Sequence, residues 1–121
     1  MTRLNERWVQ PAPIAVSVSS GSITLSPSLE QRYFIVDVDA NITSITINAP
    51  DGVVDFNVLL QFAGSYSVGG FPSTVKWGVG SNQPDFSGTN GQEVLVVLQY
   101  WGSTDGYRAD ASAAYTPTAE S

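Results

Sequence analysis

The sequence of 121 residues contains no cysteine and no histidine. Without cysteine, the chain can form neither a disulfide nor a thiolate metal site. Without histidine, it lacks the side chain that most often serves as a general base and as a metal ligand. These absences predict a protein that uses no metal and no cofactor, is not an enzyme, and instead holds or binds other molecules.

Charged residues are scarce as well, at 13% of the chain against roughly 25% in a typical soluble domain. The net charge is −6, which argues against nucleic acid and anionic membranes as partners, because both attract basic patches. Much of the surface must therefore consist of hydroxyl, glycine and apolar groups. Such a surface suits burial in an assembly, although an ordinary β protein with a neutral surface has the same composition.

Long apolar runs are also missing. Residues 1–13 have no apolar stretch after their basic residues, so they do not resemble a secretory signal. No segment approaches the ~20 apolar residues that span a bilayer. We expect a soluble protein that is made in a cytoplasm.

The clearest pattern present is strict alternation over residues 53–62, because every second side chain is large and apolar while Asp55, Asn57 and Gln61 lie between them. The apolar positions are Val54, Phe56, Val58, Leu60 and Phe62. Alternation with period two is the pattern of a strand that buries one face. No part of the chain has a comparable helical period, so an all-β protein is predicted.

Further short alternating segments, separated by turn residues, complete this prediction. Strands are expected over residues 14–19, 22–26, 32–39, 42–49, 53–62, 74–77, 92–101 and 107–111. The glycine-rich stretches 64–70 and 78–91 are expected to be loops, and no internal repeat is evident. The number and spacing of the strands predict a single antiparallel β-sandwich of the jelly-roll kind.

Three regions are expected along the chain: an extended N-terminal arm over 1–13, the β-sandwich domain over 14–111, and a loose C-terminal tail over 112–121. In the arm, Pro11 and Pro13 oppose regular strand pairing. The arm also carries Arg3, Arg7 and Trp8, which makes it a candidate for contact with a partner. The alternative is a frayed terminus, which is common at the ends of domains.

The strand over 92–101 has a second apolar row on its reverse face, formed by Leu95, Val97 and Trp101. A strand that is apolar on both faces is either covered by further elements of its own domain or packed against a neighbouring chain. These three residues are therefore candidates for contact between subunits.

The aspartates permit a catalytic site or a calcium site, and the alternative to both is a solvent-exposed strand face without chemical function. Asp37 and Asp39 share one strand face, and with Asp55 they could supply the paired carboxylates of a glycoside hydrolase. Asp37, Asp39 and Asp51 could contribute to a calcium site, although no loop supplies enough oxygen ligands. Charged side chains on a strand face more often discourage edge pairing, and we favour that interpretation.

The aromatic residues permit a further alternative, a platform for sugar rings. Its members would be Trp77, Tyr100, Trp101 and Tyr107. Packing in the core and at interfaces is the more common role of aromatic side chains, and it is the favoured interpretation.

An ordered set of segments resembles the small β-sandwich modules of tailed-phage virion proteins. In those modules an alternating strand leads to a Gly-Gly turn, a Val-Lys-Trp triplet, a Gly/Pro loop, an aliphatic strand and an Asp-Gly hairpin. The corresponding segments here are Val54–Phe62, Gly69–Gly70, Val75–Trp77, the loop through Pro84, Val94–Tyr100 and Asp105–Tyr107. The usual Trp-Pro after the Gly-Gly turn is replaced here by Phe71-Pro72.

This resemblance implies a bacteriophage structural protein that decorates or cements the capsid. On this interpretation the chain forms a homotrimer on the capsid surface, and the arm contacts the major capsid protein. Arg3, Arg7 and Trp8 would make the arm contact, and Leu95, Val97 and Trp101 the subunit contact. The alternative that the resemblance leaves open is a receptor- or glycan-binding domain of a tail fibre or baseplate.

Overall fold

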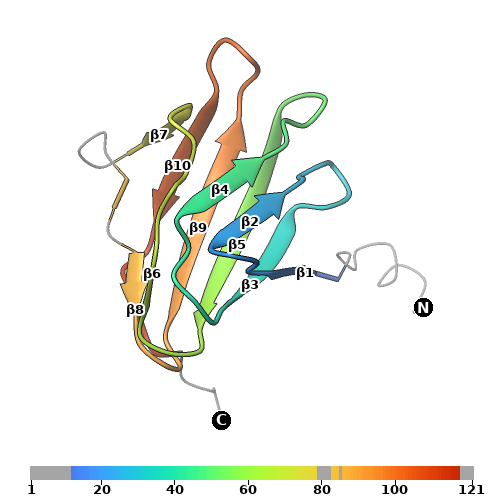
Figure 1. Cartoon of the computed structure of the whole chain (residues 1–121). Coiled ribbons are helices and arrows are strands. Elements are labelled where there is room, and N and C mark those ends of the chain that lie inside the picture. Colours follow the sequence, from blue (N-terminus) through green and yellow to red (C-terminus); the bar gives the residue numbers. More distant parts are fainter. Residues whose placement is uncertain (1–11, 79–82, 85, 118–121) are drawn as a thin grey trace.

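The computed structural model describes residues 12–78, 83–84 and 86–117, and within this part it contains ten strands and no helix (Figure 1). The all-β prediction is therefore confirmed. The strands are β1 (Ile14–Ser17), β2 (Ser22–Leu25), β3 (Tyr33–Val38), β4 (Ser44–Ile47), β5 (Val54–Phe62), β6 (Tyr66–Val68), β7 (Val75–Trp77), β8 (Phe86–Gly88), β9 (Glu93–Tyr100) and β10 (Tyr107–Ala111).

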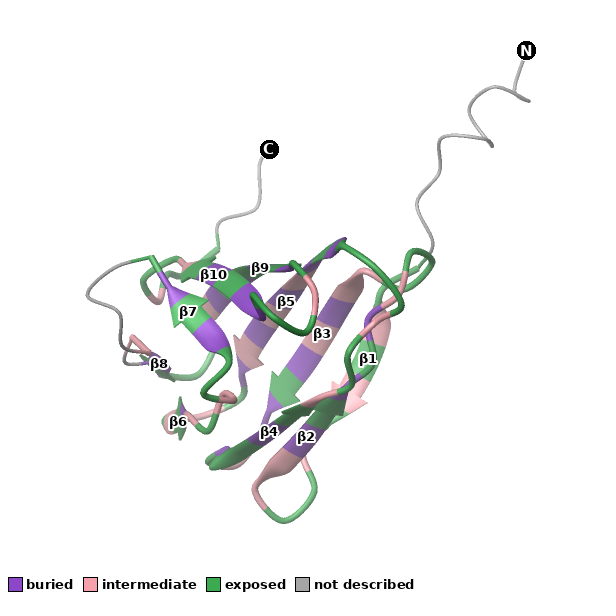
Figure 2. Ribbon diagram, turned by 90° about the horizontal axis from the view of Figure 1, so that it is seen from above, coloured by how far each residue is buried: buried purple, intermediate pink, exposed green. Residues whose placement is uncertain are grey.

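The strands form two layers that pack face to face, which is consistent with a β-sandwich (Figure 2). The larger layer is a six-stranded sheet in the order β1-β3-β5-β9-β10-β7. The second layer contains the pairs β2-β4 and β6-β8, and a parallel bridge between Ile42 and Val68 connects the two pairs. The second layer covers one face of the six-stranded sheet and leaves the other face outward.

The core lies between the layers and comes from the predicted alternation. On β5, all five apolar positions of the pattern are at most 4% exposed, which confirms the predicted buried face. Phe56 lies at the centre, where its ring makes edge contacts with Phe34 at 6.3 Å and with Tyr107 at 6.2 Å between centroids. Edge-to-face packing at such distances adds to the stabilisation from apolar burial.

The prediction of an antiparallel sandwich is wrong for much of the structure. Of the seven strand ladders among the described residues, four are parallel: β1 with β3, β3 with β5, β2 with β4, and β7 with β10. For the first three of these pairs the cause is the path of the chain, which crosses to the other layer after each of the strands β1 to β4. Consecutive strands of one layer then run in the same direction. These parallel pairs leave the jelly-roll topology unconfirmed.

The first strands wind as successive coils, and the coils are related in sequence. Ser22-Ile23-Thr24-Leu25 of β2 pairs in register with Ser44-Ile45-Thr46-Ile47 of β4. The first three of the four residue pairs are identical, and the two segments occupy equivalent positions of adjacent coils.

The connections between strands are of two kinds, tight turns and crossings between the layers. Ser20 and Gly21 form a tight turn, with φ angles of 52° and 74°, and lead from β1 to β2. Asp105-Gly106 lies in the expected hairpin between β9 and β10, which are antiparallel. By contrast, residues 50–52 do not make a hairpin, because they carry the chain from β4 in the second layer to β5 in the first.

The two glycine-rich stretches expected to be loops each contain a short strand, β6 and β8. These strands pair with each other in antiparallel fashion over three residues each. Gly88 of β8 lies against the ring of Phe62, and a Cβ at this position would stand 2.7 Å from the Phe62 Cδ1. In the sequence this glycine suggests a loop, whereas in the structure it allows β8 to pack closely against the end of β5.

The two ends of the chain are described in part. The predicted arm over 1–13 lies outside the described residues except for Ala12 and Pro13. At the other end, the predicted tail is attached to β9 in its described part: the Ser112 amide donates to the Leu95 carbonyl at 3.0 Å, and the Tyr115 amide donates to the Glu93 carbonyl at 3.0 Å. No helix long and apolar enough to cross a membrane occurs in the described residues.

Candidate interaction face

The outward face of the six-stranded sheet carries an apolar row across three adjacent strands. Ile35 of β3 pairs with Leu59 of β5, which pairs with Leu95 of β9. Neighbouring strands lie about 4.8 Å apart, so directly paired side chains on one face are in reach of one another. Ala15 of β1 pairs with Ile35 and continues the row to the edge of the sheet.

The next row adds two further apolar side chains. Tyr33 pairs with Asn57, which pairs with Val97. We refer to Tyr33, Ile35, Leu59, Leu95 and Val97 together as the apolar band. Leu95 is 37% exposed and Val97 is 41% exposed, and the other three members are half-buried. No element of the described chain covers the band.

The band is hollowed into an open groove of about 590 Å³ near the start of the described chain. Its lining is Ala12, Pro13, Tyr33, Phe34, Ile35, Asn57, Leu59 and Leu95. A concave site with a mainly apolar lining is typical of a surface that binds a partner. The groove extends from the edge strand β1 to the central strand β9, and no charged residue belongs to its lining.

Polar residues border the band on both sides. One border is the row Asp37, Gln61 and Glu93, in which the Gln61 Nε2 donates to the Glu93 Oε2 at 3.0 Å. The hydroxyl of Tyr115 donates to the Glu93 Oε1 at 3.3 Å. Desolvation, with contributions from the Glu93 charge and this hydrogen bond, raises the pKa of Tyr115. The opposite border is the row Asp55, Gln99, Arg108 and Lys76. A polar rim around an apolar centre is the common anatomy of a protein interface.

The structure separates the three residues predicted for subunit contact into two groups. Leu95 and Val97 lie together in the apolar band. Trp101 follows the end of β9, beyond the border row, and its Nε1 donates to the Gln99 Oε1 at 3.3 Å. Trp101 is 49% exposed and, with Gln99, Asp105 and Arg108, lines a separate shallow pocket of about 400 Å³.

Sequence reasoning missed Tyr33 and three exposed or half-buried aliphatic residues of this face. Ile35 and Leu59 complete the row with Leu95, and Val53, 57% exposed, lies at the same end of the sheet as Trp101. Each stands at a position where strict alternation predicts a polar side chain. An apolar residue at such a position could have indicated a second apolar face in the sequence. Their alignment depends on the parallel pairing of β3 with β5, which no local pattern reveals.

The residues predicted for the arm contact, Arg3, Arg7 and Trp8, lie outside the described residues. The described chain begins at Ala12 and Pro13, and both of these residues line the groove. The described part of the chain therefore begins at the rim of the apolar band.

The structure does not bring the acidic residues together into a paired site. Asp37 pairs with Gln61, and Asp55 precedes Gln61 by six residues on β5, which places the two carboxylates about 20 Å apart along the sheet. Glycosidase carboxylates stand ~5–10 Å apart. Within residues 12–78, 83–84 and 86–117, no three acidic side chains gather as a candidate metal site, so the arrangement of Asp37, Asp39 and Asp51 is not formed.

The aromatic platform is not assembled either. Trp77, Tyr100 and Tyr107 are at most 8% exposed, whereas Trp101 is half-exposed. Burial, together with the neighbouring Tyr100, raises the pKa of Tyr107. The Trp77 ring packs against Phe71 at 5.2 Å, so this tryptophan belongs to the core. The prediction that these aromatics pack in the core is confirmed for three of the four.

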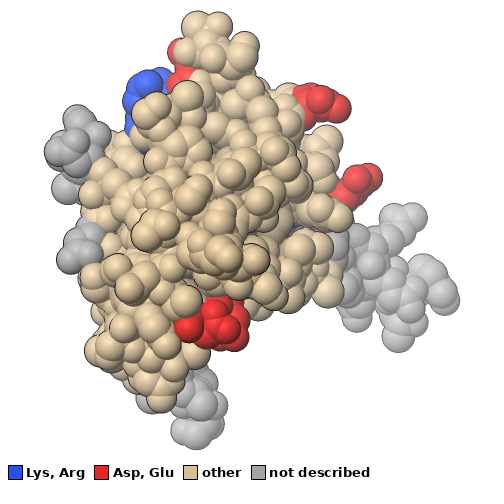
Figure 3. All heavy atoms as spheres, in the orientation of Figure 1, with Lys and Arg blue, Asp and Glu red and all other residues tan. Residues whose placement is uncertain are grey.

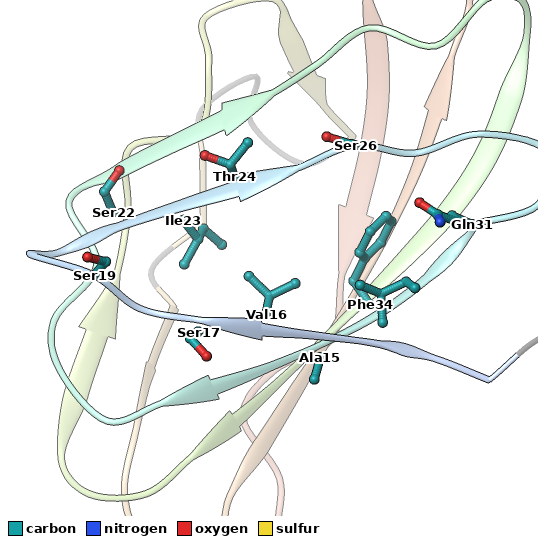
Figure 4. Close-up of a pocket in the computed structure, with 11 residues that line it drawn as sticks. Ala15, Val16, Ser17, Ser19, Ser22, Ile23, Thr24, Ser26, Gln31 and Phe34 are labelled. Carbon is teal, nitrogen blue, oxygen red and sulfur yellow. The ribbon is translucent and has the colours of Figure 1, made fainter.

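A second open groove, also of about 590 Å³, lies where both layers end at β1 and β2 (Figure 4). Val16, Ile23 and Phe34 point into it, while the hydroxyls of Ser19 and Ser22 stand at its rim. Neither β1 nor β2 contains a charged residue. The view onto the second layer likewise shows few charged side chains (Figure 3). Charge-free edge strands are sites where another strand can add to a sheet.

A scan of protein-family models found no match, and neither the curated proteins nor the solved structures provided one.

Proposed function

We propose that this protein is a self-associating structural protein of a bacteriophage virion, which decorates and cements the capsid. One observation carries the proposal: the outward sheet face holds an apolar band with a polar rim in a chain that has little charge and no histidine. Exposed apolar patches of this kind mark interaction surfaces on soluble proteins. The phage assignment itself rests on the resemblance of the ordered segments, from Val54–Phe62 to Asp105–Tyr107.

The mechanism is mass action on the assembled shell. A protein that binds only the assembled shell stabilises it by RT ln(1 + [L]/Kd), so the stabilisation increases with the logarithm of the free concentration of that protein. A stable interface buries more than ~1,000 Å² in total, so the band needs to be joined by neighbouring surface. On this proposal, Leu95, Val97 and Trp101 contact another subunit of a homotrimer at the capsid surface. Arg3, Arg7 and Trp8 of the extended arm contact the major capsid protein. The jelly-roll topology and the extended arm remain predictions from the strand spacing and from the composition of residues 1–13, and we propose no catalytic role.

Substitution within the band tests the self-association. Leu95→Glu places a carboxylate in the band beside Leu59, on the same strand face as Glu93, and we expect the variant to fold but to lose its trimer, because a buried unpaired charge is costly at an interface. Light scattering after size-exclusion chromatography measures the mass. Thr46→Glu, on the exposed face of β4 in the second layer, is the matched control and keeps the trimer. A parent protein that stays monomeric at micromolar concentration and binds no capsid contradicts the proposal.

Location on the particle tests the phage assignment. Electron microscopy of virions carrying a tagged copy should show uniform decoration of the shell. A signal confined to one vertex would instead place the protein in the tail.

The second candidate, a receptor- or glycan-binding domain of a tail fibre or baseplate, is favoured by one feature, the pocket at Trp101. An exposed tryptophan beside Gln99, Asp105 and Arg108 combines an apolar ring with hydrogen-bonding groups, which suits a sugar. Binding on a glycan array that is lost in Trp101→Ala and kept in Leu95→Glu would support this candidate over the first.

A further inference from the structure

We infer that residues 1–11 of this chain dock into the groove of the apolar band on the same molecule. This inference goes beyond the proposed function, because it concerns the free protein and requires no phage particle.

The place where the segment joins the domain supports this occupant. Ala12 and Pro13 line the groove, so the preceding residue enters at its rim. From β1 to β9 the sheet advances by three strand spacings, about 14 Å. Eleven residues in an extended conformation reach up to about 36 Å. The segment is therefore long enough to cross the whole groove.

The apolar chemistry of the segment fits the lining. Leu4, Trp8 and Val9 are its large apolar side chains. Opposite them, Ile35, Leu59 and Leu95 are aligned across three strands. An aromatic ring that enters such a groove buries a large apolar area, and its Nε1 group can remain at the polar rim.

Charge complementarity favours the same arrangement. The segment contains Arg3 and Arg7, and the border of the band contains Asp37 and Glu93. Arg32, which lies over the Tyr33 ring at 5.9 Å from its centroid, opposes the approach at one end of the band. The segment carries more positive than negative charge, whereas the chain as a whole is acidic.

Connectivity selects the chain's own segment over that of a second copy. A short tether gives an effective concentration on the order of mM, far above the micromolar concentration of a second copy in dilute solution. Docking within one molecule is therefore expected when the protein is dilute.

The test uses the absence of native cysteine, which allows a nitroxide to be placed at one engineered position in the full chain. The label is attached to Gln99→Cys, an exposed site on β9 at the far side of the band from Ala12. We expect the amide NMR signals of residues 1–8 to lose most of their intensity. The control label at Ser67→Cys, an exposed site on β6 in the pair β6-β8 of the second layer, leaves them intact.

Two further measurements decide the outcome. Leu59→Ser in the labelled protein removes the centre of the groove, and it should restore the signals while the rest of the spectrum stays dispersed. Mixing isotope-labelled chains without nitroxide with nitroxide-bearing unlabelled chains should leave the signals intact. Loss of signal in the mixture overturns the inference in favour of a second copy, and absence of any loss overturns docking altogether. All samples are measured at a protein concentration at which sedimentation shows a single chain, so neither result depends on trimer formation or capsid binding, and failure of the proposed function is seen separately.

Discussion

At the scale of single residues, close packing between the strands depends on a glycine at one position and on a large aromatic ring at another. Gly88 permits β8 to approach the end of β5, where the ring of Phe62 occupies the space that a Cβ would need. Tyr107 shows the opposite case, because a large ring that carries a hydroxyl is buried against Phe56 and Tyr100.

Gly88→Ala should destabilise the protein by ~1–3 kcal/mol, because the added methyl group overlaps the Phe62 ring and forces the strands apart. Urea unfolding monitored by tryptophan fluorescence measures the change. Gly78→Ala is the matched control, since its nearest contact would be an ordinary 3.7 Å to Asp110. Equal stability of Gly88→Ala and the parent would contradict the packing described for β8.

Because Tyr107 is buried, we expect the free energy of unfolding to decrease at alkaline pH. Its pKa is raised by burial in the folded state above the usual value of 10.0, so the unfolded chain loses the proton first. The contribution of this tyrosine to stability is complete below about pH 10 and is lost as the pH rises through the folded-state pKa. Thermal unfolding followed from pH 8 upward should show a smaller decrease for Tyr107→Phe than for the parent. Identical profiles would show that another group is responsible.

At the scale of elements, β5 is the strand that connects the core to the interaction face. It pairs with β3 on one side and with β9 on the other, and its alternate residues face opposite directions. Leu60 is fully buried between the layers, while its neighbour Leu59 belongs to the apolar band. One strand thus supports folding with one face and association with the other.

The two leucines provide a matched pair of substitutions. Leu60→Ala should cost about 2–5 kcal/mol, the usual range for a leucine removed from a packed core. Leu59→Ala should cost less than about 1 kcal/mol, since its side chain is only half-buried, but it should weaken self-association. Chemical denaturation and sedimentation analysis separate the two effects. A larger loss of stability for Leu59→Ala would mean that the register of β5 is reversed.

At the scale of the whole molecule, negative charge opposes self-association while the apolar band favours it. The net charge is −6, and the described residues contain eight acidic side chains but three basic ones. Copies that meet through the band therefore bring like charges together. The balance between the two effects depends on ionic strength.

Raising the salt concentration from about 0.1 M to about 1 M shortens the screening length from about 10 Å to about 3 Å. We expect the oligomer to become more stable over this range, because repulsion is screened while apolar burial persists. Analytical ultracentrifugation at several salt concentrations measures the association constant. Dissociation in high salt would show that ion pairs, and not the apolar band, hold the copies together.

The sequence by itself determined the all-β class, the strand over 54–62 and its buried face, and the exposure of Leu95, Val97 and Trp101. These features follow from alternation, which is local, because successive side chains of any strand point to opposite faces. Alternation does not identify the partner of each strand. Only the tertiary structure decided the parallel coils, the in-register pairing of β2 with β4, and the row that joins Ile35, Leu59 and Leu95. These depend on contacts between segments some 20 or more residues apart, so the interaction face exists only after the chain has wound between its two layers.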